Sequence, residues 1–118
     1  MSRVPGGVSV ARGIGFDDNS ARGRVTGVLV GRRYVLSGRV QRVGFRFFAF
    51  DAADREGLTG FVRNLPDGRV EILVEGESEA VHRFEMAIRQ GPRGARVDAV
   101  ETDVVAPTGS RHAFDVVG

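Results

Sequence analysis

Residues 37–46 read Ser-Gly-Arg-Val-Gln-Arg-Val-Gly-Phe-Arg and join an apolar strand to a segment with helical periodicity. The backbones of Gly38 and Gly44 can turn tightly and direct successive N–H groups toward one point. The start of the following helix adds unpaired N–H groups and a partial positive charge. Arg46 stands at that helix start, and its planar donors fit a phosphate or a carboxylate. The stretch therefore predicts a binding site for a small oxyanion.

A glycine-rich turn before a helix often only reverses the chain, so a second segment matters. Residues 60–68 read Gly-Phe-Val-Arg-Asn-Leu-Pro-Asp-Gly, a strand that ends at Asn64 and continues into a hairpin turn. Strand alternation places Leu58, Val62 and Asn64 on one face. If that face meets the helices, Asn64 approaches the helix start. Taken alone, this segment favours the interpretation of Asn64 as a side chain that caps the hairpin turn.

The two segments together resemble the acylphosphatase family. The shared patterns are Gly-x-Val-Gln-x-Val-Gly-Phe-Arg and Gly-Phe-Val-Arg-Asn-x-x-Asp-Gly, and a third, Gly-Pro-x-x-Ala-x-Val, begins at Gly91. The resemblance covers about residues 34–118. It implies an enzyme that hydrolyses small acyl phosphates to a carboxylate and inorganic phosphate.

The same resemblance implies roles for individual residues. The arginine that matches Arg46 binds the phosphate in that family, and the asparagine that matches Asn64 positions the attacking water. Backbone N–H groups would complete the phosphate cradle, and they belong to Arg42, Val43, Gly44 and Phe45. No metal and no cofactor are expected, since an acyl phosphate already has a good leaving group.

Hydrophobic periodicity predicts an α+β fold, a ferredoxin-like βαββαβ sandwich with an antiparallel sheet and two helices on one face. The expected helices span residues 45–56 and 78–90. The expected strands span residues 33–37, 58–64, 69–75, 97–106 and 113–117. Residues 1–32 lack a lasting apolar period and are expected to form a disordered or loosely attached tail, so that the acylphosphatase-like domain spans 33–118.

Charge and composition exclude several classes of protein. The chain has no cysteine and no lysine, and the segment after Arg33 holds eleven arginines against thirteen acidic residues. It therefore offers no broad basic face, and we expect no nucleic-acid partner. His82 and His112 do not have the close sequence spacing of paired metal ligands, so neither indicates a metal site. Without a long apolar run, no membrane partner is expected, and the sequence favours a cytoplasmic monomer.

Three further points concern the loop and its surroundings. Gln41 is expected to stabilise the loop rather than bind the substrate directly. Arg42 stands where many family members have glycine, and we expect it to keep ordinary φ/ψ values while Gly44 makes the turn. The phenylalanines at 45, 47, 48 and 50 are expected to form core and rim.

A non-catalytic anion-binding or regulatory module is the alternative to the enzyme.

Overall fold

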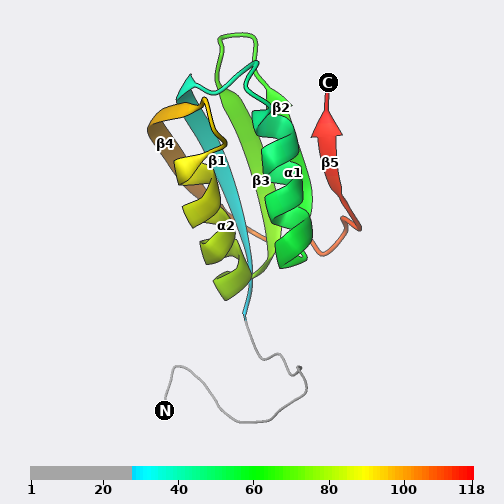
Figure 1. Ribbon diagram of the computed structural model, residues 1–118. Coiled ribbons are helices and arrows are strands. Elements are labelled where there is room, and N and C mark those ends of the chain that lie inside the picture. The colour runs from blue at the N-terminus through cyan, green and yellow to red at the C-terminus, as the bar shows by residue number, and fades with distance from the viewer. Residues whose placement is uncertain (1–27) are drawn as a thin grey trace.

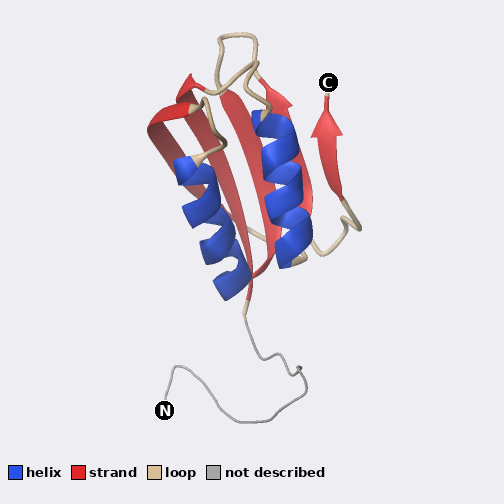
Figure 2. Ribbon diagram, viewed as in Figure 1, coloured by secondary structure: helices blue, strands red, loops and turns tan. Residues whose placement is uncertain are grey.

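Two helices cover one face of a five-stranded sheet in the computed structural model, which describes residues 28–118 (Figure 1 and Figure 2). The helices are α1 (Phe45–Glu56) and α2 (Ser78–Gln90), as the apolar periods predicted. The strands are β1 (Leu29–Arg39), β2 (Thr59–Asn64), β3 (Val70–Glu77), β4 (Arg96–Val105) and β5 (Phe114–Val117). The ferredoxin-like α+β prediction is confirmed.

The sheet is mixed, whereas an antiparallel sheet was expected. Its order is β4-β1-β3-β2-β5, and β5 pairs in parallel with β2 at one edge. The chain must cross from one edge of the sheet to the other between β4 and β5, and it reverses direction on the way. The Glu75 carboxylate fixes this crossing, because it accepts hydrogen bonds from the N–H groups of Thr108 and Gly109, each at 3.1 Å, and from the Thr108 hydroxyl at 3.0 Å.

Strand β1 begins four residues earlier than expected, at Leu29. Leu29 pairs with Glu77 of β3, and Gly31 pairs with both Glu75 of β3 and Val105 of β4. The expected boundary of the tail at residue 32 is therefore misplaced, since residues 29–32 belong to the sheet. The remainder of the expected tail, residues 1–27, lies outside the described residues.

The core lies between the helices and the sheet. From the helices it takes Phe45, Ala49, Ala52, Ala53, Ala80, Val81, Phe84 and Ile88. From the strands it takes mainly Tyr34, Leu36, Val62, Val70, Ile72 and Val74. Period-two burial in β2 confirms that Leu58 and Val62 face the helices. The loop after β1, the β2–β3 hairpin and the end of β5 lie at the same end of the sheet (Figure 1).

Candidate active site

A cavity of about 170 Å³ opens at the N-terminal end of α1. Its lining includes Arg42, Gly44, Phe45, Arg46, Phe47 and Asn64. Five of the six residues expected at the site therefore border one space, although Asn64 is far from the others in sequence. Val43 is the exception, because its side chain packs against the core. The volume is below the roughly 300–1,000 Å³ of pockets for drug-sized ligands, so it suits a small group.

The start of α1 presents free backbone donors to this cavity. Gly44 is the N-cap residue, with φ 76° and ψ 19°, and the first intrahelical bond runs from the N–H of Phe48 to the Gly44 carbonyl at 3.0 Å. The N–H groups of the first turn precede that bond and have no partner within the helix. No side chain of residues 28–118 is recorded as capping this helix start, and the first turn contains no acidic residue. The helix end therefore keeps its positive potential for an anion.

Gln41 joins the loop to the β2–β3 hairpin. Its Nε2 donates to the carbonyl oxygens of Leu65 at 2.8 Å and Arg69 at 2.9 Å. These bonds agree with the expected loop-stabilising role. They also fix the hairpin, and with it Asn64, relative to the start of α1.

Arg42 has φ 64°, in the left-handed region, so the expectation of ordinary backbone geometry was wrong. It is the one residue other than glycine with positive φ among residues 28–118. The left-handed conformation costs a residue with a Cβ about 1–2 kcal/mol. The turn therefore uses two left-handed positions, Arg42 and Gly44, where the sequence predicted that Gly44 alone would make it. Gly38 lies outside the turn, at an irregularity in the β1–β4 pairing.

The Arg46 guanidinium is held by the last strand. Its Nη1 donates to the carbonyl oxygen of Val117 at 2.9 Å. Within residues 28–118 no carboxylate lies within salt-bridge distance of Arg46, so its charge is not neutralised there. The sequence does not point to this contribution of β5, because the partner of Arg46 is a backbone carbonyl and leaves no side-chain signal.

Asn64 does not cap the hairpin turn. Bonds from the N–H of Leu65 to the Arg69 carbonyl at 2.8 Å and from the N–H of Gly68 to the Leu65 carbonyl at 3.1 Å close that turn. The Oδ1 atom of Asn64 is buried and has no hydrogen-bond partner among the described residues. A buried amide oxygen without a partner costs about 1–3 kcal/mol. An orphaned acceptor of this kind is suited to a water or a ligand.

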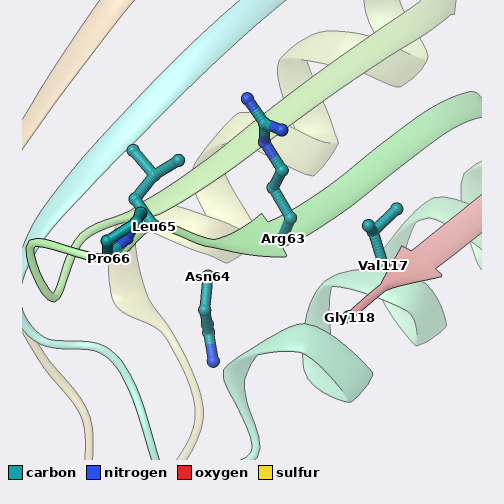
Figure 3. Close-up of a pocket in the computed structure, with 6 residues that line it drawn as sticks. All are labelled: Arg63, Asn64, Leu65, Pro66, Val117 and Gly118. Atoms are coloured by element: carbon teal, nitrogen blue, oxygen red, sulfur yellow. The ribbon is translucent and has the colours of Figure 1, made fainter.

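Asn64 also borders a second cavity of about 360 Å³. Figure 3 shows Asn64 between the hairpin residues Leu65 and Pro66 on one side and Val117 and Gly118 on the other. Asn64 is the residue common to the linings of both cavities.

The neighbouring Arg63 points to the opposite face of the sheet, as strand alternation predicted. There it pairs with Glu71 at 2.5 Å, and Arg33 binds the same carboxylate at 2.6 Å. Burial raises the pKa of Glu71, but hydrogen bonds from Arg33 and Arg63 outweigh it and hold the pKa below its ordinary value. Between residues 28 and 118 no group of three or more His, Cys, Asp or Glu side chains is arranged to hold a metal ion.

Comparison with known proteins identifies the family. The described region is a ferredoxin-like α+β domain in which most of the expected site residues gather at one helix start. The acylphosphatase family model matches residues 32–116, and the chain belongs to that family. It is an enzyme, an acyl phosphate hydrolase.

Individual relatives agree with this assignment. An acylphosphatase of Koribacter versatilis is 46% identical over 87 residues, which cover 74% of this chain and 79% of that protein. The crystal structure of acylphosphatase from Bacillus subtilis superposes with a TM-score of 0.73 at 37% identity, covering 75% of this chain and 99% of that one. Full-length HypF, in a phosphate- and nucleotide-bound form, is similar over 82% of this chain but only 13% of its own, at 31% identity and a TM-score of 0.70.

Proposed function

We propose that the chain hydrolyses small acyl phosphates without a metal ion, in a cradle formed by Arg46 and the backbone N–H groups of residues 42–46. Asn64 positions the attacking water. The observation that carries the proposal is that Arg46, the uncapped start of α1 and Asn64 border the same cavity of about 170 Å³.

The chemistry requires positioning and charge stabilisation. The oxygen of water attacks phosphorus while the bond from phosphorus to the acyl oxygen breaks, and the carboxylate leaves with the electron pair. The proton of the water passes to solvent or to the departing phosphate. Arg46 and the N–H groups stabilise the charge on the equatorial oxygens, and the Asn64 amide holds the water in line.

Phosphate release from acetyl phosphate and benzoyl phosphate, with and without a chelator, tests this function. We expect turnover of both substrates at rates that the chelator leaves unchanged, with little hydrolysis of a phosphate monoester, since no general acid from residues 28–118 lines the cavity. Inorganic phosphate should inhibit competitively. Loss of activity with chelator and its recovery with a divalent ion would refute the metal-free mechanism.

A non-catalytic anion-binding or regulatory module was the alternative, and the family assignment speaks against it, although a similar fold occupies a small part of the longer HypF chain. Such a module would bind phosphate but release none from an acyl phosphate.

The helices within residues 28–118 are too short or too polar to cross a membrane. The monomeric state, the cytoplasmic location and the absence of a nucleic-acid partner stay predictions.

A further inference from the structure

An acyl phosphate has two parts, and the cradle at the start of α1 accounts for the phosphoryl part alone. Phe47 offers a surface for the other. It lies in the first turn of α1, 63% of its surface is exposed, and it lines the cavity together with Arg46. A single exposed apolar side chain needs no explanation by itself. Met86 on α2, 60% exposed, is such a case, since it lines none of the cavities described above. Phe47 differs in its position at the anion site.

Phe47 and Asn64 approach this cavity from opposite sides. Phe45 is buried in the core between α1 and the sheet. Two residues further along a helix, the chain has turned by about 200°, so Phe47 projects from the face of α1 directed away from the sheet. Asn64 ends β2 and comes from the sheet layer. A phosphoryl group at the helix start lies between them.

In-line displacement connects this geometry to the acyl group. The attacking and leaving oxygens lie on opposite sides of phosphorus in such a reaction. If Asn64 holds the water on the sheet side, the carboxylate departs on the outer side of α1, where Phe47 is exposed. We propose that Phe47 is a specificity-determining residue whose ring contacts the acyl group and favours aromatic acyl phosphates over acetyl phosphate. The inference rests on the proposed function.

The larger cavity beside Asn64 is the competing place for the acyl group, since Leu65 and Val117 give it apolar walls. It lies, however, on the side from which Asn64 would deliver the water. In-line geometry therefore assigns it to solvent, and a variant of Leu65 separates the two arrangements.

The test compares kcat/KM for benzoyl phosphate and for acetyl phosphate within each variant, so that the intrinsic reactivity of each substrate cancels. In Phe47→Ala, the ratio of the benzoyl value to the acetyl value should fall about fivefold, the effect of losing one aromatic contact. Phe47→Tyr should retain the ratio because it keeps the ring. Met86→Ala, the matched control on α2, and Leu65→Ala should leave the ratio at the wild-type value.

An unchanged ratio in Phe47→Ala, including one produced by equal losses for both substrates, would overturn the role of Phe47. Acetyl is too small to make the same ring contact, so the benzoyl value should fall more than the acetyl value. A fall of the ratio in Leu65→Ala, with none in Phe47→Ala, would place the acyl group in the larger cavity instead. Failure of the wild-type enzyme to hydrolyse either substrate would overturn the proposed function itself.

Discussion

The outer face of the sheet and the cavity at the start of α1 both contain arginines, but only the sheet neutralises them. On the sheet, Arg33 and Arg63 share the Glu71 carboxylate, and Arg33 also reaches Asp103 at 3.2 Å. At the cavity, no carboxylate of residues 28–118 pairs with Arg42 or Arg46. Paired charges hold neighbouring strands together, whereas unpaired charges leave an attraction available to an anionic guest.

The backbone and the polar atoms differ in the same way between the two regions. β1, β2 and β3 pair in continuous register beneath the ion pairs. At the cavity, Arg42 adopts a left-handed conformation and the buried Oδ1 of Asn64 lacks a partner among the described residues. Unfavourable features of this kind concentrate at functional sites, where the surrounding structure holds them in place. If this division between a stabilising face and a functional end is real, substitutions in the two regions should affect different properties of the protein.

Arg46→Ala should produce the largest effect. A charge-assisted contact to the phosphoryl group serves both the ground state and the transition state, so we expect kcat/KM for acetyl phosphate to fall by about 10³-fold or more. Steady-state kinetics and the inhibition constant of inorganic phosphate measure the loss. Arg33→Ala, on the sheet, is the control: it should lower the melting temperature and keep the activity of the folded enzyme. An equal loss of activity in Arg33→Ala would break the comparison.

Asn64→Ala should reduce kcat by roughly 10²–10³-fold, the typical effect of removing one oriented polar group. The inhibition constant of inorganic phosphate should change much less, because the proposed role of the amide is to hold the water and not the phosphoryl oxygens. Removing a buried, unpartnered Oδ1 should also leave stability unchanged or slightly higher. Equal losses of phosphate binding and turnover would contradict the separate roles of Arg46 and Asn64.

Glu71→Gln should affect stability and spare the chemistry. The variant leaves two arginines without their shared carboxylate, so the free energy of unfolding should fall by about 1–2 kcal/mol. Urea denaturation at pH 7 measures this change. Activity per folded molecule should match that of the wild type, because Glu71 lies on the face of the sheet away from the cavity.

The same residue predicts a pH dependence. The pKa of Glu71 is lower in the folded protein than its ordinary value, although burial opposes this, because Arg33 and Arg63 bind the ionised form. Its stabilising contribution is therefore present above the unfolded pKa of about 4.3 and is lost as the pH falls through the lower folded pKa. Between pH 7 and pH 3, wild type should lose more stability than Glu71→Gln. Parallel pH profiles would show that the ion pairs contribute nothing.

Sequence predicted the local features of this molecule better than its long-range contacts. Apolar periods identified both helices, and strand alternation brought Asn64 to the side of the sheet where Arg46 lies. The start of β1 was missed because residues 29–32 have no lasting apolar period of their own, and they join the sheet only by pairing with β3 and β4, which lie far along the chain. The bond from Arg46 to the Val117 carbonyl depends on the edge pairing of β5, to which no local pattern points.

Arg42 was misjudged because nothing in its side chain indicates a turn, and it offers the finest test of the functional end. Its φ of 64° means that Arg42→Gly removes a conformational penalty, and because the side chain is exposed its loss should cost little packing. We expect the free energy of unfolding to rise by about 1 kcal/mol, net of the added flexibility of the unfolded chain. Denaturation in urea measures this gain.

Arg39→Gly is the matched control for Arg42→Gly, since Arg39 is also exposed and its φ is not positive. There the same change should destabilise by about 0.4–1 kcal/mol. Loss of the Arg42 cation should also raise KM for acetyl phosphate at low ionic strength, and the difference from wild type should shrink as salt screens the charge. The effect on stability appears in denaturation and the effect of the lost charge appears in KM, so each can be refuted without the other. Equal destabilisation in both glycine variants would mean that the left-handed turn at Arg42 is not strained. A KM difference between Arg42→Gly and wild type that persists at high salt would mean that Arg42 contacts the substrate directly.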